Sequence, residues 1–135
     1  MTELSLYERL GGDPGVLDLV TRFYDYMDQD ETAHIIRDKH PKDLSNARQR
    51  LYEYFTGWFG GPPLYTSQYG HPRLRARHMH VAIGIADRDS WMHCIRRAMF
   101  DMDLAPELYA DLIEKIEPMA DHMRNRTTEA PLTDC

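Results

Sequence analysis

Cysteine is scarce in this chain, and long apolar runs do not occur in its sequence. Only Cys94 and Cys135 are present in 135 residues, which excludes a disulfide framework and is typical of a reducing compartment. No apolar run reaches membrane-spanning length. Charges interrupt the N-terminal segment too early for a secretory signal. We therefore expect a cytoplasmic protein without a membrane anchor.

Positive charge is in deficit, with 16 Lys and Arg residues against 22 Asp and Glu residues and a net charge of −6. This balance argues against nucleic acid or an anionic membrane surface as a partner. The sequence contains no Cys-x-x-Cys and no His-Glu-x-x-His zinc motif. The Gly60–Pro63 segment is rigid and lacks the lysine and hydroxyl of a phosphate loop, and no Ser-His-Asp order can be identified.

What the sequence does contain is helical periodicity. Apolar residues recur at helical spacing in four segments, which predicts four main helices. These segments are residues 14–29, residues 43–59, a third that starts near Asp87 or Asp89, and a fourth that starts near Pro106. Asp13 is the expected N-cap of the first segment, and a short helix is expected over residues 4–10. The pattern predicts an all-α fold in a single domain over residues 1–135, with its core at about residues 5–126 and a flexible tail at 127–135.

The middle of the chain is irregular. A loop through Tyr65 and Tyr69 is expected to lead into a short helix that has Pro72 in its first turn. The apolar segment 81–85 fits a strand, but no second strand pattern is there to pair with it. Long irregular segments in a compact domain are often functional.

The short helix carries the most informative residues. His71 and His78 lie seven residues apart, about two helical turns, among Arg73, Arg75 and Arg77. An imidazole beside arginines suits a metal group that also carries negative charge, and haem with its iron and two propionates fits. From spacing alone, a surface or hydrogen-bonded core histidine is the simpler interpretation. His71 and His80 compete for the ligand role, and a non-haem metal at His78 and His80 is also open.

Two aromatic residues have both a structural and a functional interpretation. Tyr24 lies on the apolar face of the first long helix, and Trp91 lies near the start of the third. Both fit ordinary core packing. Each also carries a donor that can point into an apolar cavity.

Several segments in order resemble the second group of truncated haemoglobins, the two-over-two bacterial globins, over about residues 5–126. The segments that carry the resemblance are Gly11-Gly12, Arg22-Phe23-Tyr24, Gly60–Tyr65, Gly70–His78, Asp87–Trp91 and His122–Asn125. The resemblance implies a two-over-two helical sandwich and a haem b cofactor.

The resemblance also implies roles for individual residues. It makes His78 the proximal iron ligand and places Tyr24 and Trp91 on the ligand side. His40 matches a ring residue over the haem, and Ala47 matches the position where many globins carry a distal histidine. The other implied contacts with the cofactor are Leu51 and Tyr54, together with four residues near the propionates: Arg50, Tyr65, His71 and Arg77.

The function that follows is reversible binding of O2, CO and NO at a five-coordinate haem iron. Hydrogen bonds to charged groups contribute about 1.5–3 kcal/mol each. Donation from Tyr24 and Trp91 would therefore slow O2 release by roughly two to four powers of ten. The alternative is an NO dioxygenase or a peroxidase, which needs a separate reductase because no flavin or nicotinamide motif is present. A haem-based sensor and a cofactor-free helical protein are also open, and we expect a monomer or a homodimer.

Overall fold

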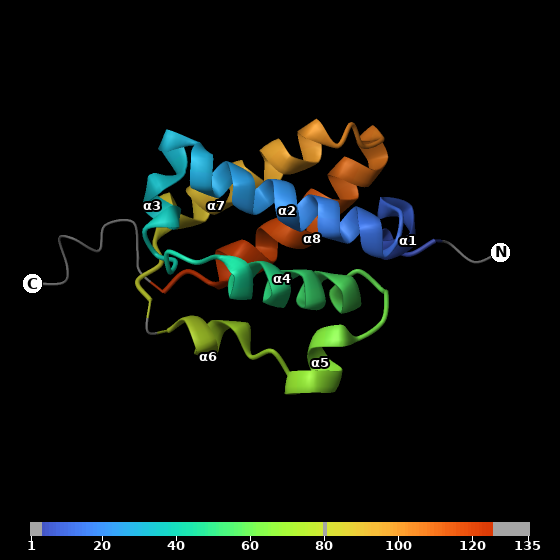
Figure 1. Ribbon diagram of the computed structural model, residues 1–135, viewed down its shortest axis with the longest axis horizontal. Coiled ribbons are helices and arrows are strands. Elements are labelled where there is room, and N and C mark those ends of the chain that lie inside the picture. The colour runs from blue at the N-terminus through green and yellow to red at the C-terminus, as the bar shows by residue number, and fades with distance from the viewer. Residues whose placement is uncertain (1–3, 80, 126–135) are drawn as a thin grey trace, which may run out of the picture.

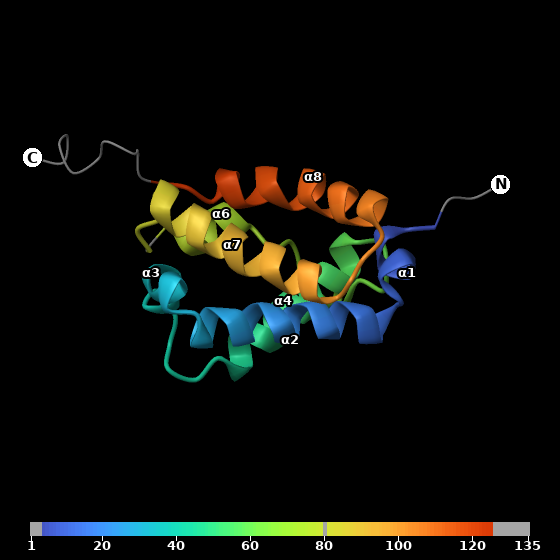
Figure 2. The same ribbon diagram turned by 90° about the horizontal axis from the view of Figure 1, so that it is seen from above.

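Two pairs of long helices form the body of the protein (Figure 1). Helix α2 (Asp13–Gln29) packs against α4 (Ser45–Trp58), and α7 (Ile85–Asp101) packs against α8 (Pro106–His122). The two pairs face one another, with α2 against α7 as the main contact between them (Figure 2). The computed structural model describes residues 4–79 and 81–125. The predicted all-α two-over-two sandwich is confirmed.

Short helices precede or connect the long ones. They are α1 (Leu6–Leu10), the 3-10 helix η1 (Glu31–Ala33), α3 (His34–Arg37), α5 (Leu64–Tyr69) and α6 (Leu74–His78). No strand is present in the described parts of the chain. Within the same residues, no helix is both long and apolar enough to cross a bilayer. The tail at 127–135, with Cys135, lies outside the described residues.

A tight turn joins α1 to α2. Gly11 ends α1 with φ +103°, a left-handed conformation that glycine adopts without strain. The N-cap of α2 is Gly12 and not Asp13, so that prediction was wrong. The Asp13 carboxylate instead accepts a hydrogen bond of 2.9 Å from the Tyr7 hydroxyl. Gly15 lets the chain pass close to α1, because a Cβ there would overlap the Leu10 carbonyl oxygen.

The core lies where the two helix pairs meet. Leu19, Val20 and Phe23 of α2 are fully buried, as is Ile95 of α7. Leu112 and Ile116 of α8 complete this layer and are also fully buried. The helical spacing of these apolar residues therefore identified the buried faces correctly.

The connecting segments differ from the prediction in three places. Tyr65 and Tyr69 lie in helix α5, which Pro63 precedes, whereas a loop was expected. Pro72 lies before α6 and not in its first turn, since that helix begins at Leu74. The apolar segment after α6 runs directly into α7, which begins at Ile85 and not near Asp87 or Asp89. The Asp87 carboxylate caps that start by accepting the Gly84 N–H at 2.8 Å.

Candidate functional site

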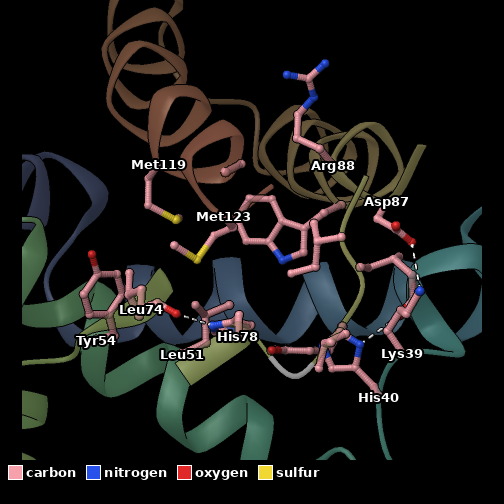
Figure 3. Close-up of a pocket in the computed structure, with 16 residues that line it drawn as sticks. Lys39, His40, Leu51, Tyr54, Leu74, His78, Asp87, Arg88, Met119 and Met123 are labelled. Atoms are coloured by element: carbon pink, nitrogen blue, oxygen red, sulfur yellow. Dashed lines mark hydrogen bonds and ion pairs between the residues drawn. The ribbon is translucent and has the colours of Figure 1, made fainter. Parts of the chain in front are cut away.

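A cavity of about 310 Å³ lies between α2, α4, α6, α7 and the end of α8 (Figure 3). Its wall is largely apolar, which is typical of cofactor pockets. The lining residues are Tyr24, Ile36, Lys39, His40, Leu51, Tyr54, Leu74, His78, Val81, Ile83, Asp87, Arg88, Trp91, Met119, Ala120 and Met123. Among the described residues, no group of three or more His, Cys, Asp or Glu side chains could hold a metal ion.

His78 occupies the last position of α6 and lines this cavity. Its Nδ1 lies 2.7 Å from the Leu74 carbonyl oxygen (Figure 3). A carbonyl oxygen only accepts hydrogen bonds, so Nδ1 carries the proton and Nε2 of the neutral ring carries the lone pair. This is the arrangement that metal-binding histidines show, with one ring nitrogen held by a carbonyl and the other available.

Tyr24 and Trp91 bring two donors to the cavity from opposite helices, α2 and α7. Phe23 supports both, with ring centroids 4.8 Å from Tyr24 and 4.9 Å from Trp91. Among the described residues, neither the Tyr24 hydroxyl nor the Trp91 indole N–H has a hydrogen-bond acceptor. Burial raises the pKa of Tyr24 well above its ordinary value, so the hydroxyl keeps its proton.

His40 follows α3 and is half-buried beside the cavity. Its Nδ1 lies 2.9 Å from the Ile36 carbonyl oxygen. Burial lowers the pKa of His40 below its ordinary 6.5, and the nearby Arg37 and His78 lower it further. The ring is therefore neutral near pH 7, with its proton on Nδ1 and a lone pair on Nε2.

Charged side chains lie at one end of the cavity. Lys39 donates to the Ala82 carbonyl oxygen at 2.8 Å, and its Nζ is 3.9 Å from an Asp87 carboxylate oxygen (Figure 3). Arg88 forms a 2.6 Å ion pair with Asp121 of α8. These contacts connect the start of α7 to both the α3 segment and α8.

The structure brings together only part of the predicted site. His78, Tyr24, Trp91, His40, Leu51 and Tyr54 all line the cavity, and burial raises the pKa of Tyr54 to about 12. Ala47 is partly buried next to the core and does not line it. His80 and the side chain of Arg77 lie outside the described parts of the structure.

Three residues expected near an anionic group do not line the cavity. Arg50 stacks over the Tyr69 ring, with its guanidinium carbon 4.1 Å from the ring centroid. Tyr65 is buried against the aromatic rings of Tyr54 and Tyr69. His71 is exposed, and its Nδ1 accepts the Arg73 N–H at 3.0 Å. None of the three lines the cavity.

Sequence reasoning missed part of the cavity wall. Met119 and Met123 were predicted only as the core face of the last helix, yet both line the cavity, Met119 from α8 and Met123 from just beyond its end (Figure 3). Val81 and Ile83 line it as well. The unpaired apolar segment 81–85 was the signal, because apolar residues without a partner strand need another apolar surface.

The residues present fit a haem. The wall offers apolar area, and His78 contributes a ring nitrogen with a lone pair. Tyr24 and Trp91 contribute two donors from the long helices that have no acceptor within residues 4–79 and 81–125. A flat apolar ring with a central metal and a polar ligand would satisfy all three features.

The comparisons with known proteins agree with this fold. Residues 5–125 match the family model described as bacterial-like globin. The chain is 34% identical over 122 residues to the group 2 truncated haemoglobin YjbI of Bacillus subtilis, covering 90% of this chain and 89% of that protein.

Two solved structures are similar along nearly their whole length. The group II 2-on-2 haemoglobin of Agrobacterium tumefaciens is 42% identical with a TM-score of 0.89, over 93% of this chain and 97% of that one. The truncated oxygen-avid haemoglobin of Bacillus subtilis is 34% identical with a TM-score of 0.81, over 90% and 100%. The chain therefore belongs to the bacterial-like globins, as a group II truncated haemoglobin whose family binds haem and diatomic gases.

Proposed function

We propose that this globin holds haem b through Nε2 of His78 and binds O2 tightly beneath Tyr24 and Trp91. The observation that carries the proposal is that one cavity is lined by two donors, which have no acceptor among the described residues, and by an imidazole whose Nδ1 is already hydrogen-bonded. When bound, ferrous haem supplies an iron that takes O2, CO or NO.

His78 is the proposed proximal ligand. The hydrogen bond from Nδ1 to Leu74 fixes both the ring orientation and the tautomer. It also makes Nε2 more basic, because donation from Nδ1–H leaves more electron density on the neutral ring. Leu51, Tyr54, Met119 and Met123 would cover the faces of the cofactor and exclude water.

Tyr24 and Trp91 are the proposed ligand-stabilising residues. Both enter a largely apolar cavity, where donors held in place act more strongly than in water. Neither has to break a hydrogen bond with the described residues in order to donate one to a ligand. The related Bacillus subtilis haemoglobin is oxygen-avid, which supports tight binding here.

The role that we propose for His40 differs from that of Tyr24 and Trp91. Its proton lies on Nδ1 and is engaged by Ile36. The neutral ring therefore presents a lone pair toward the cavity rather than a proton. It can order the Tyr24 hydroxyl or approach the iron, but it does not add a third donor. For the iron to be five-coordinate, as we propose, His40 would have to remain unbound to it.

The test compares the absorption spectra of His78→Gly, the parent and a control variant, His71→Gly. Each protein is measured in its ferric, ferrous and CO-bound forms. We expect the parent and the control to show the same Soret band, because His71 lies away from the cavity. His78→Gly should lose most of that band and regain it when imidazole is added. An unchanged His78→Gly spectrum would refute the proposal.

A further inference from the structure

We infer that Asn125, just beyond α8, is a positioning residue that fixes the backbone carrying His78. This inference rests on the proposed function and adds to it a residue outside the cavity. The end of the described chain passes beside the connection between α6 and α7 (Figure 1). Four hydrogen bonds join Asn125 to that connection.

These contacts use the backbone N–H of Asn125 and both polar atoms of its side chain. The side-chain Nδ2 donates to the His78 carbonyl oxygen at 3.2 Å and to the Val81 carbonyl oxygen at 2.8 Å. The side-chain Oδ1 accepts the Ile83 N–H at 2.8 Å. The backbone N–H of Asn125 donates to the Ile83 carbonyl oxygen at 2.9 Å. One residue thus holds three positions of a segment more than forty residues earlier.

The pattern sets the orientation of the amide. Two carbonyl oxygens face one end of the side chain, and an N–H faces the other. A flipped amide would point its oxygen at both carbonyls, so only one orientation satisfies the network. An aspartate at 125 would have nearly the same shape and would place a negative oxygen against those carbonyls.

Helix α6 depends on such an external contact. It has five residues, and isolated helices of that length are unstable in water. Its N-cap, Arg73, has φ +47° and makes no side-chain cap. The Val81 N–H also donates to the His78 carbonyl at 3.0 Å, so Asn125 completes a turn that already closes on the histidine.

The three residues that Asn125 holds all line the cavity. Because His78 closes α6, a shift of its carbonyl moves the residue's Cα and with it the imidazole. Asn125 does not line the cavity, and its hydrogen bond to His78 goes to the backbone oxygen. It acts through the backbone, in the way that outer-shell contacts set the geometry of metal ligands.

The experiment compares Asn125→Asp, Asn125→Ser and Glu117→Gln with the parent, all as full chains that are loaded with haem except where stated. Glu117→Gln is the matched control, because it removes a 2.6 Å ion pair of α8 with Arg96 away from the α6 connection. Three quantities are measured: the rate of haem transfer to excess apomyoglobin, the iron–histidine stretching frequency of the ferrous form, and amide exchange at Ile83 in the haem-free protein.

For Asn125→Asp we expect haem loss to be about 10–100 times faster, in line with outer-shell substitutions at other metal sites. We also expect a changed stretching frequency and faster exchange at Ile83, with exchange in α2 unchanged. Asn125→Ser keeps a single donor and should give an intermediate result, while Glu117→Gln should match the parent.

Parent-like haem loss and stretching frequency in both Asn125 variants would overturn the inference. If Asn125→Asp does not fold, Asn125→Ser decides. A parent that fails to bind haem, or an unaltered His78→Gly, would instead overturn the proposed function, so the two failures can be told apart.

Discussion

The phenol ring of Tyr24 meets the imidazole of His40 edge to face, with ring centroids 6.0 Å apart and planes at 77°. The Arg48 guanidinium carbon lies 5.7 Å from the centroid of the same Tyr24 ring. Tyr24 is therefore held between aromatic and cationic neighbours. Its hydroxyl keeps its place at the cavity without a hydrogen bond to the described residues.

The two donors can be tested separately. Removing one hydrogen bond to a polarised ligand costs about 1.5–3 kcal/mol. Tyr24→Phe and Trp91→Phe should each raise the O2 dissociation rate about 10- to 100-fold. Stopped-flow replacement of O2 by CO measures this rate. Tyr52→Phe is the control, since Tyr52 does not line the cavity, and unchanged rates in both cavity variants would contradict the assignment.

Asp30 predicts a pH dependence of stability. Hydrogen bonds from Thr32 and then from His93 lower the pKa of Asp30 from 3.8 to about 2. The carboxylate thus stays charged in the folded protein at pH values where it is protonated in the unfolded chain. Its contribution is complete above pH 4 and is lost as the pH falls toward 2.

Asp30→Asn should therefore lower the free energy of unfolding by about 1 kcal/mol at pH 7, which is less than the full pKa shift would give because solvent screens the contacts. The difference from the parent should shrink between pH 4 and pH 2. Urea denaturation across this range measures it, with Asp18→Asn as the control for an exposed ion pair of α2. A difference that stays constant with pH would contradict the prediction.

The close approach of Gly15 to Leu10 predicts that a side chain at position 15 would lower stability. Alanine usually stabilises a helix relative to glycine by up to about 1 kcal/mol. Here the added methyl group would overlap the Leu10 carbonyl oxygen, and overpacking of this kind costs about 1–3 kcal/mol. Gly15→Ala should lower the urea midpoint, whereas Thr21→Ala on the exposed face of α2 should leave it unchanged or raise it slightly. An equal or higher midpoint for Gly15→Ala would show that α1 moves freely.

The long helices were predictable because their apolar residues repeat with the helical period and are followed by clear breakers such as Gly60-Gly61. Boundaries at Asp13 and Asp87 were harder, since several polar residues in a row can cap a helix and the tertiary contact decides. Tyr65 and Tyr69 lie on a helix whose six residues are too few to show a period.

The site was predictable in part for a related reason. Tyr24 and Trp91 stand on long helices, so their faces follow from periodicity, and the family resemblance singled out His78 among three histidines. Arg50 and His71 could not be placed in this way. Their long or exposed side chains settle on nearby partners, Tyr69 and Arg73, that no sequence pattern reveals. Asn125 depends on contacts with residues 78–83, which only the folded chain brings together.

The cavity wall combines residues from an early and a late part of the globin domain. Tyr24 leaves the ribosome early, whereas Met119 and Met123, which cover another part of the same wall, are among the last of the described residues to be made. While α8 is still inside the ribosome, the cavity lacks the part of its wall that Met119 and Met123 form. We therefore expect haem to bind late, when translation of the globin domain is nearly finished.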